Sequence, residues 1–495
     1  MATHNAPTDL PPRADISCRN QTDSGAFRRP AAEAQAGPRT FCGLMGVFGS
    51  DRAADDIWLG LHALQHRGQE SAGIVTSDNG ALHCLKDSGL LQQAVPRDKA
   101  KSLLPGRFGI GHVRHAGPGM EGQQNIEPLV IGYSSGTVAI AHNGALTNGH
   151  ALRDEYEAYG AIFQTSTDSE LLVHMLAKPT HIIKDDPLGH CLGHLDGAFC
   201  FLHLTSDALI AARDPRGFRP LALGRLPGGG WAVASETVAF DALGARCERE
   251  ILPGEIVTID AAGLHTRFFH GIAGGGGGHT PTALCMFEHV YFARPDSIVF
   301  GVNVHQARYR LGQAVARECP VDADIVVPIP DSGYSAALGY SRESGIPQDR
   351  GIVRNHYVGR SFIKARQSQR TLDVTMKHNV VKPVVEGRRL VIVDDSLVHG
   401  TTMGILVKSL RDAGAREIHL RLSCPPNLHP CRYGVGFTNQ GELLAAKFPA
   451  ARICADFKLD SIGYCSLEGA KAAMSGQTKN YCDACFTGLY PTGNA

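Results

Sequence analysis

The sequence predicts two domains of different fold class: an α+β domain of stacked antiparallel strands, followed by an α/β domain built on a parallel sheet. Three observations support this division. The chain has 495 residues, enough for two or three domains with separate cores. Short β-rich runs dominate its first half, whereas apolar strand runs alternate with helical patterns in its second half. Between them lies GIAGGGGGHTPT, residues 271–282, which is typical of a linker.

Composition excludes several classes of partner. Lys plus Arg and Asp plus Glu both total 48, so net charge provides no bulk attraction to nucleic acid or to a membrane surface. No apolar run approaches the length of a bilayer-spanning helix. The 14 cysteines accompany no secretory pattern, so metal ligation or catalysis explains them better than a disulfide framework. We therefore expect a cytoplasmic protein with no nucleic-acid or membrane partner.

The first 41 residues show no hydrophobic periodicity and are rich in Ala, Pro, Arg and Thr, which predicts disorder. Two interpretations fit this segment: an ordinary disordered tail, or a propeptide that is removed just before Cys42. The stretch that follows, CGLMGVFG, repeats glycine every three residues. That spacing suits a buried strand with close backbone approach, or a turn that exposes the thiol.

Residues 42–275 form the predicted α+β domain. The runs GTVAIAHNGAL, GAFCFLHL and EIVTID have the composition of strands. Two segments have apolar residues at helical spacing, DDIWLGLHALQHRG and DSELLVHMLAK, and a Thr-Asp pair is expected to cap the second. The strands and helices together predict stacked antiparallel sheets with helical cover.

Residues 283–495 form the predicted α/β domain. Apolar runs in ADIVVPIPDSG, GIVRN, RRLVIVDDSLVHGTTM and EIHLRLSC are each followed by a turn signal or a helix. Runs of this kind are typical of strands buried in a parallel sheet.

The end of one of these strands carries the clearest chemistry in the sequence. The apolar run 390–393 leads into Asp394 and Asp395, and residues 396–402 then enter a helical segment. Ligands of open α/β sheets bind at the carboxyl ends of strands. A Gly-Thr-Thr loop that opens a helix offers N–H groups and hydroxyls to a phosphate, and the two acids can hold ribose hydroxyls or hydrated Mg²⁺. A simpler alternative, that the acids only cap the helix, does not explain the whole combination.

This segment resembles the phosphoribosylpyrophosphate (PRPP) loop of type I phosphoribosyltransferases. PIPDSGYSAALGY resembles a second loop at a strand end, and RNHYVGRSFIKARQSQR resembles the lid that closes over the donor. The resemblance implies a Mg²⁺ site at Ser332, Asp394 and Asp395. It also implies a PRPP site that comprises Asp331, Ser332, Gly333, Lys364, Asp394, Asp395, Ser396, His399, Gly400, Thr401 and Thr402.

Motifs of the first half narrow the resemblance. CGLMGVFG, LQHRGQESAG, GHVRH, AHNGALTN, STDSE and RDPRGFRPLALG resemble an N-terminal-nucleophile glutaminase of αββα architecture. Together with the second half, they resemble the glutamine PRPP amidotransferases, also called amidophosphoribosyltransferases, from Cys42 to about Pro491. The resemblance implies that the chain is cut before Cys42.

The same resemblance assigns roles in the first half. The α-amine of Cys42, freed by the cut, would act as base for its own thiol. Asn143 and the Gly144 backbone would stabilise the oxyanion, Arg114 would bind the glutamine carboxylate and Asp168 its ammonium group. Taken singly, a core cysteine and a tight Asn-Gly turn remain simpler alternatives for Cys42 and Asn143.

Four cysteines correspond to a metal site in many relatives. Cys482 and Cys485 have C-x-x-C spacing, and the resemblance adds Cys285 and Cys431. Four thiolates fit a 4Fe-4S cluster, and the same number fits a tetrahedral zinc ion.

Several positions depart from the family pattern. His399, His356 and Thr375 stand where Arg is usual, and His115 and Ala145 replace other common residues. Two explanations stay open: neutral drift, or a paralogue in secondary metabolism with an altered phosphoribosyl donor or acceptor. A non-catalytic regulatory paralogue is a third alternative, but it should have lost Cys42.

The expected reaction converts glutamine, PRPP and water into 5-phosphoribosylamine, glutamate and pyrophosphate, the first committed step of purine biosynthesis. Ammonia is expected to pass inside the protein. The resemblance further implies feedback inhibition by purine nucleotides and a homotetramer.

Overall fold

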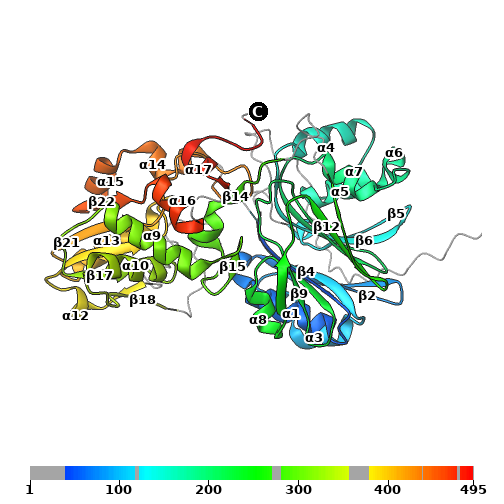
Figure 1. The fold of residues 1–495 in the computed structure, drawn as a ribbon, viewed down its shortest axis with the longest axis horizontal. Coiled ribbons are helices and arrows are strands. Elements are labelled where there is room, and N and C mark those ends of the chain that lie inside the picture. Colours follow the sequence, from blue (N-terminus) through cyan, green and yellow to red (C-terminus); the bar gives the residue numbers. More distant parts are fainter. Residues whose placement is uncertain are drawn as a thin grey trace, which may run out of the picture.

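The computed structural model describes residues 40–116, 122–269, 280–355, 378–437, 439–475 and 480–493. Two bodies of different architecture lie side by side, one from each half of the sequence (Figure 1). The predicted linker falls mainly in residues 270–279, which lie outside the described residues, as do most of residues 1–41 and the lid segment 356–377. No helix among the described residues is both long and apolar enough to cross a membrane.

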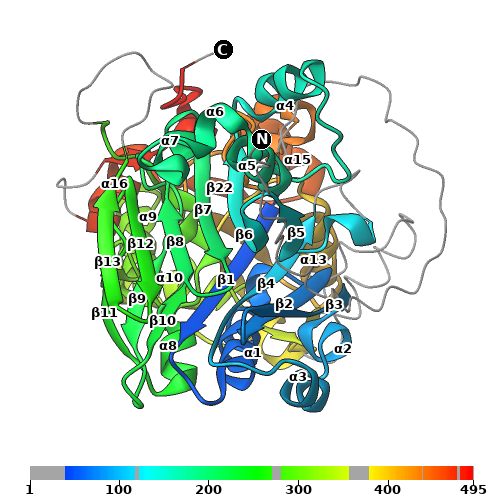
Figure 2. The same cartoon turned by 90° about the vertical axis from the view of Figure 1, so that its right-hand side faces the viewer.

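The amino-terminal half consists of two stacked antiparallel sheets (Figures 1 and 2). One sheet has the order β11-β9-β10-β1-β4-β2-β3, and the other has the order β13-β12-β8-β7-β6-β5. Apolar side chains such as Leu44, Val75 and Leu202 fill the space between them. The strands are β1 Thr40–Phe48, β2 Ser71–Asp78, β3 Ala81–Ser88, β4 Phe108–Ala116, β5 Leu129–Tyr133, β6 Gly136–Leu146, β7 Gly197–Leu204, β8 Leu209–Arg213, β9 Ala222–Arg225, β10 Trp231–Ala234, β11 Arg246–Glu250, β12 Glu255–Asp260 and β13 Gly263–Phe268.

Helices cover the outer face of each sheet, which confirms the expected αββα fold. Ile57 and Phe240 belong to the core beneath the first sheet, and Leu172 and Leu192 belong to the core over the second. The helices of the first layer are α1 Ala53–Ala63, α2 Leu91–Ala94, α3 Arg97–Leu103 and α8 Val238–Leu243, and those of the second are α4 Gly149–Ala158, α5 Asp168–Ala177, α6 Pro179–Ile182 and α7 Pro187–Gly193.

The carboxy-terminal half is built on a parallel sheet of order β17-β20-β21-β22, as the sequence predicts. Val391 and Val393 of β20 face one core, whereas Leu390 and Ile392 face the other, so a strand buried on both faces requires an uninterrupted apolar run. The sheet strands are β17 Ile325–Pro328, β20 Arg389–Asp394, β21 Glu417–Leu422 and β22 Ser461–Tyr464, and the helices are α9 Val304–Glu318, α10 Tyr334–Ser344, α12 Lys382–Val385, α13 Thr401–Asp412, α14 Leu444–Lys447, α15 Ala450–Phe457, α16 Leu467–Ser475 and α17 Ala484–Thr487.

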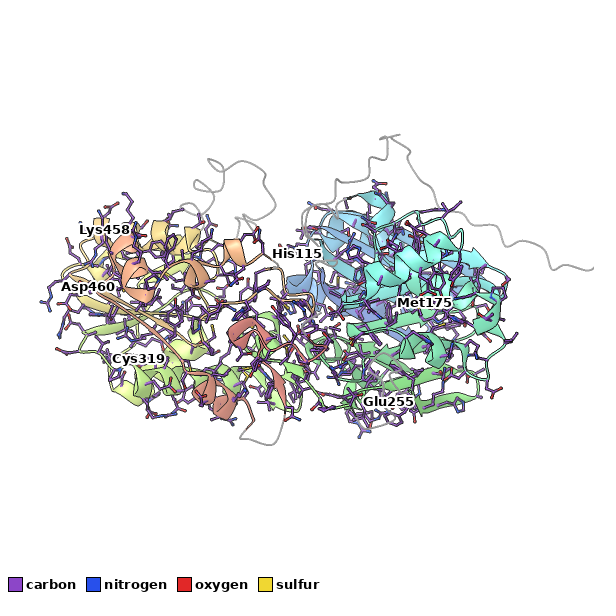
Figure 3. All side chains as sticks on the ribbon, turned by 90° about the horizontal axis from the view of Figure 1, so that it is seen from above. His115, Met175, Glu255, Cys319, Lys458 and Asp460 are labelled. Carbon is purple, nitrogen blue, oxygen red and sulfur yellow. The ribbon has the colours of Figure 1, made fainter. Side chains whose placement is uncertain are left out.

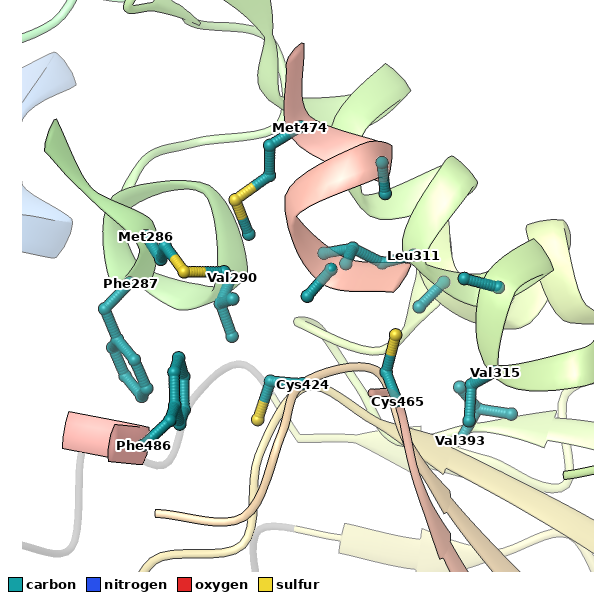
Figure 4. Close-up of a cluster of buried hydrophobic side chains, with 14 of the residues drawn as sticks. Met286, Phe287, Val290, Leu311, Val315, Val393, Cys424, Cys465, Met474 and Phe486 are labelled. Carbon is teal, nitrogen blue, oxygen red and sulfur yellow. The ribbon is translucent and has the colours of Figure 1, made fainter. Parts of the chain in front are cut away.

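The carboxy-terminal segment packs into the core that Val391 and Val393 face. Met474 and Phe486 pack with Met286 and Phe287, which immediately precede the short π-helix Glu288–Phe292 (Figure 4). Short strand pairs complete this half: β14 Leu284–Cys285 with β23 Tyr481–Cys482, β15 Ile298–Val299 with β16 Val302–Asn303, and β18 Ile352–Arg354 with β19 His378–Val380.

Three local expectations differ from the structure. The run GIVRN is a strand, but β18 pairs antiparallel with β19 outside the parallel sheet. The fourth sheet strand is β22, which the sequence reading missed because its four residues are only partly apolar. At the start of α5, Thr167 makes no side-chain cap bond within the residues that the structure describes; Asp168 instead accepts from the distant Leu146 N–H.

Candidate active sites

Cys42 lies on β1 beside Arg114 of β4, because these two residues are direct partners in the antiparallel register. Cys42 is fully buried. Arg67 Nε donates to the Cys42 carbonyl oxygen at 3.0 Å, so a buried guanidinium fixes the main chain of this residue. Gly68 lets the chain after Arg67 pass close against β4, since a Cβ there would lie 2.5 Å from the Arg114 nitrogen.

One terminal nitrogen of the Arg114 guanidinium is hydrogen-bonded and the other is not. Its Nη1 donates to Asn125 O at 2.7 Å, whereas Nη2 is buried and has no hydrogen-bond partner among the described residues. Buried polar groups are normally hydrogen-bonded, and an unpaired charged donor is especially costly. This nitrogen therefore favours an anionic ligand such as a carboxylate.

Asp168 is connected to Arg114 through one short segment. Asn125, whose carbonyl binds Arg114, exchanges side-chain and backbone hydrogen bonds of 3.0 Å with Ser166, two residues before Asp168. Asp168 Oδ2 accepts from Leu146 N–H at 3.0 Å. Burial raises the pKa of Asp168 to about 7, although that hydrogen bond and Arg153 oppose the shift. A cationic partner would restore the charged form.

Asn143 and Gly144 lie on β6, which packs against β1 from the second sheet. Both polar atoms of the Asn143 amide are buried, and within the described part of the chain neither has a hydrogen-bond partner. Gly144 has a φ of 146°, and a Cβ there would lie 2.0 Å from Ala198 O, so only glycine fits. An unpaired amide beside a backbone of this shape is the donor set that an oxyanion needs.

Glu127 is a buried carboxylate that the sequence did not single out, and it supports strand β6 through hydrogen bonds. Glu127 Oε2 accepts from His142 N–H at 2.8 Å, and Oε1 accepts from Ser169 Oγ at 2.6 Å. It thereby ties the residue before Asn143 to the residue after Asp168. Burial raises the pKa of Glu127.

The second candidate site lies where β17 and β20 end side by side in parallel register. Ser332 Oγ donates to Asp394 Oδ1 at 3.3 Å, and Asp395 N–H donates to the same oxygen at 2.9 Å. Burial and the negative charge of Asp395 raise the pKa of Asp394 well above its ordinary value. Carboxylate and hydroxyl oxygens are the donors that Mg²⁺ prefers, so this set fits the predicted ion.

The flanking loops have tightly packed backbones. A Cβ on Gly333 would lie 2.4 Å from Val393 O, and Asp331 pairs with Arg354. Gly400 has a φ of 78° at the start of α13, and a Cβ there would meet Phe457 at 2.7 Å. Ser396 donates to Asp395, and Thr401 and Thr402 occupy the first turn of the helix.

His399 behaves differently from the neighbouring loop residues. It is exposed, and its Nδ1 lies 3.1 Å from the Glu442 carbonyl oxygen, so the imidazole holds the segment before α14. The expected contact of His399 with a phosphate remains a prediction. Lys364, His356 and Thr375 lie outside the described residues.

The four cysteines of the predicted metal site line one small cavity. Cys285 and Cys482 are direct partners in the β14–β23 pair, and Cys431 Sγ accepts from Tyr433 N–H at 3.3 Å and Val435 N–H at 3.4 Å. Cys485 and apolar side chains complete the lining. Among the described residues, no three Cys, His or acidic side chains converge on a single ion position. Four thiols facing one cavity, with donors to sulfur, nevertheless fit a cluster in which each thiolate has its own iron.

The halves match two family models. Residues 112–242 match a glutamine amidotransferase domain, and residues 305–433 match a phosphoribosyl transferase domain.

Curated relatives match across both halves. The amidophosphoribosyltransferase of Bacillus subtilis is 41% identical, with 91% of this chain and 94% of the relative covered. That of Methanocaldococcus jannaschii is 43% identical, with 91% and 98% covered. Among solved structures, the B. subtilis glutamine PRPP amidotransferase complexed with ADP and GMP is 41% identical with a TM-score of 0.83, over 91% of this chain and 97% of that one.

Proposed function

The chain belongs to the amidophosphoribosyltransferase family, and we propose that its two halves divide the family's reaction between the two sites described above. The reaction takes the amide nitrogen of glutamine and joins it to PRPP, which gives 5-phosphoribosylamine in purine biosynthesis. The observation that carries the division is a pair of buried groups near the strand of Cys42, the Asn143 amide and Arg114 Nη2, for which the described residues provide no hydrogen-bond partner.

In the amino-terminal half, the proposed nucleophile is Cys42. With residues 1–41 removed, its α-amine takes the proton of its own thiol, and the thiolate attacks the glutamine amide. Arg114 Nη2 binds the substrate carboxylate, and Asp168 binds the ammonium group. Asn143 Nδ2 and the Gly144 N–H stabilise the oxyanion. The amide nitrogen leaves as ammonia, and water releases glutamate from the thioester.

In the carboxy-terminal half, the proposed donor site joins the ends of β17 and β20. Asp394 and Asp395 orient the ribose, residues 331–333 receive the pyrophosphate and residues 396–402 receive the 5-phosphate. Ser332 and Asp394 would hold Mg²⁺, which when bound neutralises charge on the departing pyrophosphate. Ammonia attacks the anomeric carbon as pyrophosphate leaves. A Cβ on Gly434 of this half would lie 3.1 Å from the Gly144 carbonyl carbon, so the halves meet at the oxyanion site, which supports an internal route for ammonia.

Assays with two nitrogen sources test this function. Purified protein with Mg²⁺ and PRPP should form phosphoribosylamine with glutamine and, separately, with ammonia. Absence of product with both sources would refute the proposal. A specialised paralogue is not favoured, because the curated relatives that match both halves are named amidophosphoribosyltransferases.

Glutamine binding should weaken as pH falls through about 7. Below that value the Asp168 carboxyl, whose pKa burial raises to about 7, is protonated and loses its attraction for the substrate ammonium. The KM for glutamine should rise about tenfold per pH unit below about 6, and kcat should fall separately as the Cys42 α-amine, whose ordinary pKa is about 8, is protonated. Asp168→Asn should give a high KM without this pH dependence. A KM for wild-type protein that stays flat from pH 6 to 8 would contradict the role.

The same pKa shift has the opposite sign for stability without substrate. Because folding raises the pKa of Asp168, the folded protein binds the proton more tightly than the unfolded chain. That contribution to stability is fully present below the unfolded pKa and is lost as pH rises through about 7. Glutamine should therefore stabilise the protein more strongly at pH 8 than at pH 6.

We further propose that the cysteine cavity holds a 4Fe-4S cluster. Anaerobically purified protein should contain about four irons per chain, since this cluster takes one thiolate from each cysteine. Cys482→Ser should lose the iron and lower the unfolding temperature, because ligation joins β14, β23 and the Cys431 loop. Cys454→Ser, which changes a partly buried thiol outside this cavity, is the control. Stoichiometric zinc without iron would favour the tetrahedral alternative.

Regulation, assembly and location are also proposals. The B. subtilis structure with ADP and GMP supports inhibition of this chain by purine nucleotides. We propose that the chain forms a homotetramer and that it is cytoplasmic; relatives from plants are named chloroplastic. Sedimentation with and without nucleotide tests the assembly.

A further inference from the structure

Four buried charges link the two halves, and together we call Arg67, Arg219, Glu236 and Glu288 the Glu288 brace. None is more than 5% exposed. Arg67 donates to Glu288 Oε1 at 2.8 Å and to Oε2 at 3.0 Å, and Arg219 donates to Oε1 at 3.0 Å. Arg67 also donates to Glu236 at 2.6 Å. Glu288 begins the π-helix of the second half, so its carboxylate crosses between the halves to hold two arginines of the first half.

One end of the brace holds the proposed nucleophile. The Arg67 guanidinium that binds Glu288 through its terminal nitrogens donates through Nε to the Cys42 carbonyl oxygen. The side chain is therefore fixed on three sides and cannot shift without moving β1. Because Cys42 becomes the first residue after the proposed cut, this hydrogen bond would restrain the main chain of a new terminus.

The other end reaches the proposed oxyanion site. Arg219 Nη2 donates to Tyr433 O at 2.9 Å. The next residue, Gly434, packs on Gly144 so closely that an added Cβ would lie 3.2 Å from both Gly144 O and Arg219 Nη2. Cys431, which lines the cysteine cavity, accepts from Tyr433 N–H in the same turn. The brace thus contacts the backbone that supports Gly144.

Stability alone gives a weak reason for this arrangement. The four charges balance, but a buried ion pair is often no more stable than apolar residues of similar size. Geometry gives a stronger reason, because a reaction that needs the thiol and the oxyanion donors in register loses about 100-fold for a displacement of about 1 Å.

We propose that Glu288 is a positioning residue that keeps Cys42 and Gly144 in register, so that the glutaminase site is complete only when the second half is packed against it. This inference rests on the proposed glutaminase function. The phosphoribosyl half supplies Glu288 and Gly434 to the hydrolytic site, although neither residue touches glutamine.

The test compares nitrogen sources in full-length Glu288→Gln. The variant keeps the side-chain shape but removes the charge that both arginines share. We expect kcat with glutamine to fall by about 10- to 100-fold. The KM for glutamine should change by less than about threefold, because Arg114 and Asp168 are untouched. Ammonia-dependent synthesis should stay within about twofold of wild type, and it reports that the same preparation is folded.

Glu255→Gln is the matched control. Glu255 is a buried carboxylate of the amino-terminal half that accepts two hydrogen bonds from Arg249, and Figure 3 shows it within that half. This control should retain both activities. Equal losses with glutamine and ammonia in Glu288→Gln, or an unchanged glutamine rate, would overturn the inference. An inactive wild-type protein would instead refute the underlying function.

Arg67→Lys provides a second test that keeps the buried positive charge and is the deciding variant if Glu288→Gln does not fold. The substitution replaces the forked guanidinium with a single ammonium group. It should lower glutamine-dependent synthesis and leave ammonia-dependent synthesis close to the wild-type rate. The double variant should be no slower than the slower single variant, since both break one unit. Additive losses would mean that the two residues act separately and would contradict the proposal.

Discussion

Replacement of Cys42 by alanine is expected to abolish glutamine-dependent synthesis of phosphoribosylamine while ammonia-dependent synthesis continues at close to the wild-type rate. In the proposed site the thiol alone forms a covalent bond with the substrate. Its loss should therefore lower the rate of glutamine-dependent synthesis by at least about a thousandfold. The change removes one sulfur from a buried strand and leaves Arg114 and the donor site in place. Parallel assays with the two nitrogen sources measure the effect.

Cys200→Ala is a suitable control, since this thiol is equally buried in the same half and has no proposed role. Retention of glutamine-dependent activity in Cys42→Ala would refute the nucleophile assignment. Intact mass provides an independent check, because active wild-type protein should begin at Cys42. An active species that still carries residues 1–41 would exclude the α-amine as base.

Replacement of Asp394 by asparagine is expected to have the reciprocal effect. Synthesis should fall by at least about 100-fold with either nitrogen source, because the substitution removes a charge that would hold Mg²⁺ and orient the ribose. Hydrolysis of glutamine measured without PRPP should persist. Product assays and glutamate release from one preparation distinguish the two activities.

Asp412→Asn is the control for this substitution, since Asp412 lies at the exposed end of α13 and pairs with Lys408. It should leave both activities unchanged. An active Asp394→Asn variant would mean that the donor site does not depend on this carboxylate, and Asp395 would then require the same test.

Local chemistry explains which parts of the fold could be predicted from the sequence. The run at 390–393 is apolar at every position because both faces of β20 are buried, and the paired acids follow where a parallel strand must end. Strand β18 could not be placed, because its partner β19 lies beyond a long segment and nothing local specifies the pairing. Strand β22 has only four residues, so its apolar pattern is too weak to predict a strand.

The candidate sites show the same limit. Residues within motifs, such as Asn143 and Gly144, could be singled out because the motif itself carries the geometry. The partners of Arg67 could not, since Glu236 and Glu288 are distant in sequence and charged residues ordinarily indicate surface. The Glu442 carbonyl oxygen beside His399 Nδ1 is likewise distant in sequence and could not be predicted, while the expected phosphate contact of His399 stays a prediction.

The pairing of β14 with β23 has a consequence for how the protein is made. A ribosome delivers the amino-terminal half first, and domains generally fold as they emerge. The pairing of Cys285 with Cys482, however, can form only after Cys482 has been synthesised and has left the exit tunnel. A nascent or prematurely terminated chain can therefore build both antiparallel sheets yet lacks the segment that closes the second core. Under the coupling proposed above, a chain that stops before Cys482 would therefore not hydrolyse glutamine.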